Sequence, residues 1–289
     1  MMGTQTTFVG WDTTEACFAT SYLVLIVGIG CALVCWWQFR RSWPSLDSLS
    51  ASFTLFSLLE GLSYGFSGIA HHMLTAYYWD HRTMSTSWGH ANAGWMLPWT
   101  ASVLLGPMAS ALGLSTALSF AEAGVGWIRA SRAVGLAISL LEGCLALFDV
   151  GHTGTLSLFW AFVAAAAGCC VLFKAGPSVR GFFMCEAGYF VRVVAYLMLF
   201  TVPAACRTDS RVIIVHTETG VLYRRAPRSA ECWYAEWFNQ NAWSHSLIAV
   251  SILVIFGGIL AKLGHDRELA YLTVMRSPYD KDPTRSWGV

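Results

Sequence analysis

The sequence carries little charge. Only 12% of its 289 residues are Asp, Glu, Lys or Arg, whereas a soluble domain carries about 25%. Hydrophobic residues make up 55% of the chain, and this composition predicts a multi-pass membrane protein. The net charge is +1 and no basic groove or aromatic stacking platform is visible, so nucleic acid is excluded as an expected partner.

Several motifs are also missing. The nine cysteines include no CxxC pair or other zinc-finger spacing, so we expect most of them to be small packing residues. No glycine-rich phosphate loop, nucleophile elbow or Walker motif is present. The first fourteen residues lack the basic region of a cleaved signal peptide, and Arg40 and Arg41 follow the first apolar run. We therefore expect that run to remain as a membrane anchor.

Long apolar runs are what the chain does have. A helix needs about 20 apolar residues to cross a bilayer. Only Gly151 and His152 separate the fourth run from the fifth, which we interpret as two antiparallel helices joined by a tight turn. The sequence therefore predicts an all-α, polytopic membrane protein with a seven-helix transmembrane bundle. Its spans are 15–37, 50–77, 91–117, 131–150, 153–174, 181–204 and 241–263.

Lysine and arginine are concentrated on one side of these spans. The short connections on the other side hold only Arg82. By the positive-inside rule, the N-terminus lies outside or in a lumen and the C-terminus lies in the cytosol. We therefore divide the chain into a transmembrane domain at 1–263 and a polar cytosolic tail at 264–289. The basic residues on the cytosolic side are Arg40, Arg41, Arg129, Arg132, Lys174, Arg180, Lys262, Arg267, Arg276, Lys281 and Arg285.

The longest connection, 205–240, is the only sizeable piece expected outside the membrane. VIIVH and VLYRR flank Thr217–Gly220, which predicts a small outer β-hairpin. ECWYAEWF follows and is typical of an interfacial aromatic helix. Cys206 and Cys232 bracket the connection on the non-cytosolic side. We hypothesise a disulfide between them, with two free thiols as the alternative.

The segment 60–72, EGLSYGFSGIAHH, has two faces when it is drawn as a helix. Glu60, Tyr64, Ser67 and His71 fall on one narrow stripe, which must face protein or water instead of lipid. The glycines form a second stripe, where a neighbouring backbone can approach closely. These glycines are Gly61, Gly65 and Gly68.

Three charged residues, Glu60, Glu142 and Arg192, fall near the middle of predicted spans. A charge at the bilayer centre costs about 2.5–3.5 kcal/mol on insertion scales, and arginine stays charged under essentially all conditions. We therefore expect Arg192 to pair with Glu60 or Glu142, or to line water. This intramembrane charge network is either a structural lock between helices or a proton relay, ion relay or ligand counter-charge.

A second set of polar residues is expected near the outer surface. Ser67 and His71 lie one helical turn apart, and so do Asn241 and His245. Imidazoles that converge from several helices can bind Zn²⁺ with an open coordination position that activates water. Taken singly, histidines at this depth are usually hydrogen-bonded helix ends. The other members of the outer set are His72, His90, Asn92, Asp149 and His152.

These motifs carry a resemblance. A seven-span chain with SxxxH in its second span and a histidine opening its seventh resembles the superfamily of alkaline ceramidases and progestin/adiponectin-type receptors. The resemblance rests on Ser67, His71 and His245. It implies a zinc site for lipid-amide hydrolysis, with His71 and His245 among the metal ligands and Ser67 as a catalytic candidate.

The chain departs from that superfamily's pattern at two places. Ala249 stands where a second histidine of the seventh span would be, so Asn241, one turn before His245, would have to serve as the metal ligand. The third span has no Asp, and Asn92 or His90 would have to take its role.

Because the zinc pattern is incomplete, the sequence favours a non-catalytic subunit or scaffold of a larger membrane assembly. Its partners would be membrane lipids and other membrane protein subunits, with the hairpin and the tail as docking elements. The first alternative is a zinc-dependent lipid-amide hydrolase or a lipid-binding receptor, whose cofactor would be Zn or a bound lipid. The second is a channel, transporter or receptor built on the mid-membrane charges.

Overall fold

The computed structural model describes residues 6–8, 15–40, 48–81, 96–148, 154–201, 212–217, 220–225 and 238–276. Helices dominate this part of the chain, and three short strands form an antiparallel sheet in the order β1-β2-β3. The strands are β1 (Thr6–Phe8), β2 (Val212–Thr217) and β3 (Gly220–Arg225). The helices are α1 (Glu15–Phe39), α2 (Leu49–His81), α3 (Met96–Phe120), α4 (Val125–Phe148), α5 (Thr155–Ala175), α6 (Phe182–Thr201) and α7 (Gln240–Arg276).

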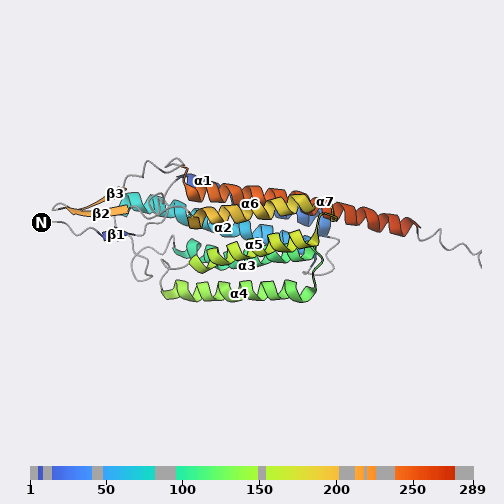
Figure 1. The fold of residues 1–289 in the computed structure, drawn as a ribbon. Coiled ribbons are helices and arrows are strands. Elements are labelled where there is room, and N and C mark those ends of the chain that lie inside the picture. Colours follow the sequence, from blue (N-terminus) through green and yellow to red (C-terminus); the bar gives the residue numbers. More distant parts are fainter. Residues whose placement is uncertain are drawn as a thin grey trace, which may run out of the picture.

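The helices lie side by side along one common direction (Figure 1). The packed neighbours are α1 with α2 and α7, α3 with α2, α4 and α5, and α6 with α5 and α7. α4 forms one edge of the bundle, the sheet lies at one end, and α7 runs past the other end (Figure 1). Thr6 of β1 pairs with Ile214 of β2, so the sheet joins the beginning of the chain to the connection between α6 and α7.

Five of the described helices are long and apolar enough to cross a membrane, as is typical of an integral membrane protein. Large apolar side chains such as Ile26, Phe173 and Phe190 are exposed on the outside of the bundle, where lipid would surround them. α2 and α4 are not among the five. The apolar stretches are Glu15–Phe39, Leu97–Phe120, Thr155–Ala175, Phe182–Thr201 and Gln240–Leu272.

α1 and α2 pack with their backbones in close contact. A Cβ atom added at Gly28 would lie 2.6 Å from the carbonyl oxygen of Ser57 and 2.8 Å from the Cα of Gly61. The Ser57 hydroxyl donates a hydrogen bond of 2.9 Å to the Gly28 carbonyl. Gly65 and Gly68 meet α1 at the side chains of Leu25 and Tyr22, so the glycine stripe of α2 lies along α1 as its spacing predicts.

α7 is longer than the predicted seventh span. It continues without a break from that span through Gly264 to Arg276, into the segment we expected to be a polar tail. Lys262 is buried, and its Nζ lies 2.9 Å from Glu122 Oε1 and 3.7 Å from Asp266 Oδ2. The first of these ion pairs fixes α7 to the turn between α3 and α4.

We predict that Gly28→Ala lowers the free energy of unfolding by about 1–3 kcal/mol, because the added methyl group cannot fit against the backbone of α2. Gly30→Ala is the matched control on the same helix, since nothing lies within 4 Å of a Cβ placed there. It should be neutral or stabilising by up to about 1 kcal/mol. Thermal unfolding of the two variants in detergent measures the difference, and equal midpoints would contradict the close contact.

Candidate functional site

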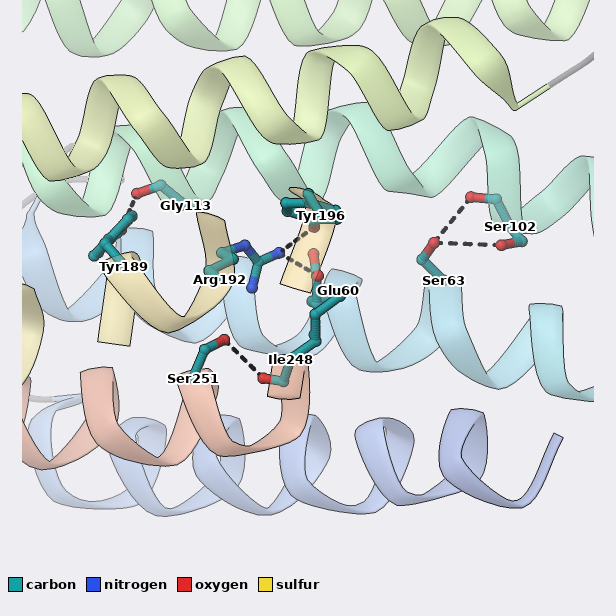
Figure 2. A network of polar contacts seen from close by, with 9 residues as sticks. All are labelled: Glu60, Ser63, Ser102, Gly113, Tyr189, Arg192, Tyr196, Ile248 and Ser251. Carbon is teal, nitrogen blue, oxygen red and sulfur yellow. Dashed lines mark hydrogen bonds and ion pairs between the residues drawn. The ribbon is translucent and has the colours of Figure 1, made fainter. Parts of the chain in front are cut away.

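The centre of the bundle holds a buried ion pair (Figure 2). Glu60 of α2 and Arg192 of α6 are only 2% and 3% exposed. The Nη2 group of Arg192 donates to Glu60 Oε1 and, over 3.1 Å, to the hydroxyl oxygen of Tyr196, one turn further along α6. The structure thus brings together two of the three residues expected in the intramembrane network.

Aromatic rings surround the guanidinium. The Cζ atom of Arg192 lies 5.0 Å from the ring centroid of Phe56 and 5.5 Å from that of Tyr196. Both distances allow a cation–π attraction, which is strongest where water is excluded. Phe56 stands one turn before Glu60 on α2, so that helix supplies both the counter-charge and one of the aromatic faces.

Glu142 does not join this network, which corrects the sequence prediction. Its two carboxylate oxygens accept hydrogen bonds from the backbone N–H groups of Gly154, at 3.0 Å, and Ser157, at 2.7 Å. These donors lie at the N-terminus of α5, where N–H groups have no partner within the helix and the helix dipole favours a negative charge. Glu142 of α4 is therefore a helix cap and links α4 to α5.

A proline accounts for a second link at the same place. Pro107 lies inside α3 and has no N–H group to donate to the carbonyl of Val103, four residues earlier. The Ser157 hydroxyl donates to that carbonyl over 3.2 Å, and the indole N–H of Trp160 donates to the carbonyl of Pro107 over 3.0 Å. The break in the hydrogen bonding of α3 is thus used to attach α5.

His245 of α7 faces α1. Its Nδ1 atom lies 3.1 Å from the Ser21 hydroxyl, 3.4 Å from the Thr20 hydroxyl and 3.3 Å from the Cys17 carbonyl oxygen. The ring of Tyr64 packs against the imidazole edge to face, with centroids 5.0 Å apart. This environment is that of a hydrogen-bonded histidine that holds α7 against α1 and α2.

The other expected zinc ligands have different neighbours. His71 packs edge to face on Trp99 of α3. Ser67 is buried on α2, and the backbone N–H of Asn241 donates to the side chain of Asn239, which caps the start of α7. Within the described ranges, no group of three or more His, Cys, Asp or Glu residues could hold a metal ion. The zinc site that the resemblance implies stays a prediction, because His90 and Asn92 lie outside the described ranges.

Some predictions concern residues outside the described ranges. They are the catalytic candidate Asn92, the other outer residues His90, Asp149 and His152, and the disulfide candidates Cys206 and Cys232.

Two contacts involve residues that the sequence reasoning did not select. The Cys169 thiol of α5 donates to Glu186 Oε1 of α6 over 3.1 Å. Glu186 lies within a predicted span, and an acid inside an apolar run is a signal that could have identified it. The Tyr189 hydroxyl donates to the Gly113 carbonyl of α3 (Figure 2). No local pattern in the sequence indicates that second contact.

Comparisons with protein-family models, curated proteins and solved structures give no match to this chain.

We predict that Glu60→Gln lowers the free energy of unfolding by about 3–5 kcal/mol, because it leaves Arg192 buried without a counter-charge. The double variant Glu60→Met/Arg192→Met removes both charges and should recover most of that loss. Unfolding in detergent micelles measures both variants. If Glu60→Gln is as stable as the native chain, the ion pair does not hold α2 to α6.

Proposed function

We propose that this integral membrane protein is a non-catalytic subunit or scaffold of a larger membrane assembly. The observation that carries the proposal is that several of its buried polar side chains bond from one helix to another. A polar group in a low-dielectric interior is costly unless it is satisfied. These side chains meet that requirement with bonds that hold neighbouring helices together.

The interhelical bonds involve nearly every helix of the described bundle. Ser63 of α2 donates to the Ser102 carbonyl of α3 over 3.0 Å, and Ser115 of α3 lies 2.8 Å from Ser131 of α4, oxygen to oxygen. Together with the Glu60–Arg192 pair and the contacts of Ser157 and His245, these bonds join the seven helices, α1 through α7, into one body. Such a body suits a component that holds its shape while other molecules bind its surface.

We further propose that α2 and α4 cross the membrane with the other five helices. α2 lies between α1 and α3, and its polar residues Glu60, Ser63 and Ser67 are buried. α4 turns Leu136, Leu140 and Leu141 outward and buries Ser139 and Glu142. These five polar side chains face protein, which is how a membrane span tolerates such groups.

The N-terminus lies outside or in a lumen in this proposal, and the C-terminus lies in the cytosol. In the described helices, every Lys and Arg except Arg192 lies at the end of the bundle from which α7 extends. Trp36 and Trp37 are exposed at the same end, and Arg40 stacks on both indole rings at 5.2 and 4.7 Å. Basic residues with interfacial tryptophans are typical of a cytosolic membrane boundary.

We predict that a reporter which fluoresces only in the cytosol is bright when fused after Val289. In intact expressing cells the fused reporter should resist added protease, and it should be cut once the membrane is permeabilised. A reporter cut in intact cells would reverse the proposed orientation.

The docking element for other subunits is the end of α7. This end of α7 runs past the other helices (Figure 1). Leu269, Tyr271 and Leu272 are exposed in the last turns of α7. An exposed helix with apolar side chains gains stability when a partner covers it. The rest of the bundle would be held in lipid while this helix is presented to the partner.

We predict that gentle detergent extraction yields a complex heavier than the 31.7 kDa of one chain, as measured by native mass spectrometry. Leu269→Ser/Leu272→Ser should release the companion, and Glu268→Ser, a change at the exposed residue just before Leu269, should not. Recovery of the native chain as a stable monomer with no companion would count against the proposal.

A further inference from the structure

The connection between α5 and α6 displays two positive charges. Lys174 is the last residue but one of α5, and Arg180 lies two residues before α6 begins. Both side chains are exposed, and neither has an ion-pair partner among the described residues. Glu186 is the only acid between 155 and 201. Its Oε1 atom accepts a hydrogen bond from the Cys169 thiol and forms no ion pair with Lys174 or Arg180. The positive charge of this corner is therefore uncompensated.

Two phenylalanines extend outward beside these charges. Phe173 precedes Lys174 and is 77% exposed, and Phe183 follows Arg180 by three positions and is 73% exposed. Exposed rings on membrane helices face acyl chains, whereas Lys and Arg prefer the polar boundary above them. The corner thus exposes both apolar rings and cations, the two kinds of group that the acyl chains and the headgroup of an anionic phospholipid would contact.

The backbone holds this corner in one shape. Gly176 and Gly181 have φ angles of 83° and 84°, which residues with a side chain rarely adopt. Any Cβ at Gly181 would collide with the Gly258 carbonyl of α7. The Phe182 N–H donates to the Val179 carbonyl over 3.0 Å within the connection. The two cations are therefore displayed from a turn that is packed against the bundle.

We propose that the α5–α6 corner, formed by Phe173, Lys174, Arg180 and Phe183, binds the headgroup of an anionic phospholipid. Ammonium and guanidinium groups donate strong, charge-assisted hydrogen bonds to phosphate oxygens. Anionic lipid attracts basic residues near the membrane surface, and here two cations without an ion-pair partner belong to the same short connection. This inference adds a specific lipid partner and does not depend on the scaffold role or on the α7 docking helix.

The test is a titration of purified, detergent-solubilised protein with phosphatidylglycerol or phosphatidylcholine, with bound lipid counted by native mass spectrometry. The native chain should bind phosphatidylglycerol at lower concentration than phosphatidylcholine. Each cation is expected to contribute about fivefold to that affinity, so Lys174→Gln/Arg180→Gln should need about 25-fold more phosphatidylglycerol for half occupancy. Its phosphatidylcholine binding should not change.

The control variant is Arg267→Gln/Arg276→Gln, which removes the same charge from the part of α7 beyond the bundle and should leave phosphatidylglycerol binding intact. Inorganic phosphate should not displace the lipid, because it lacks acyl chains to cover the phenylalanines. The proposal is overturned if the native chain shows no preference for phosphatidylglycerol, if Lys174→Gln/Arg180→Gln retains it, or if phosphate alone displaces the lipid. Should the double variant not fold, each single variant must show the fivefold loss.

Discussion

Arg192 keeps its charge at any physiological pH, and the fold buries it between α2 and α6. A lone guanidinium in a hydrocarbon environment is too costly to maintain, so a carboxylate has to lie opposite it. That requirement sets the rotation of both helices about their axes. A shift by one residue along either helix would turn the charged side chain away from its partner by about 100°. α2 packs on α1 and α3, and α6 packs on α5 and α7. The Glu60–Arg192 pair therefore joins two groups of helices across the centre of the bundle.

The same constraint explains why α2 is less apolar than its neighbours. Within about one turn, Glu60 reaches α6, Gly61 touches the backbone of α1, and Ser63 donates to a carbonyl of α3. A helix with protein on three sides can carry small and polar residues that a lipid-facing helix cannot. α2 thus has small and polar residues at the positions where it contacts other helices. It is less apolar because it lies between those helices and faces little lipid.

Properties that depend on one helix could be predicted from the sequence, and choices between distant partners could not. The apolar runs predicted the five apolar helices, and helical periodicity placed the glycines of α2 against a neighbour. The permanent charge of Arg192 was enough to predict that a carboxylate lies opposite it. Whether Glu60 or Glu142 would serve depended on the packing of helices, because Glu142 is taken by free N–H groups at the start of α5. Likewise, His245 meets the Cys17 carbonyl 228 positions away, a contact that no local pattern encodes.

The locks also bear on the kind of function that the bundle can perform. A transporter or switch needs two arrangements of its helices that differ by only a few kcal/mol. Parting α2 from α6 would break the Glu60–Arg192 pair at a cost of about 3–5 kcal/mol, and Ser57, Ser63 and His245 would lose partners if α1, α3 and α7 moved as well. A new arrangement would have to satisfy all of these groups again in a low dielectric. This cost agrees with the proposed role as a rigid bundle, with the α5–α6 corner and the projecting end of α7 as its proposed binding surfaces.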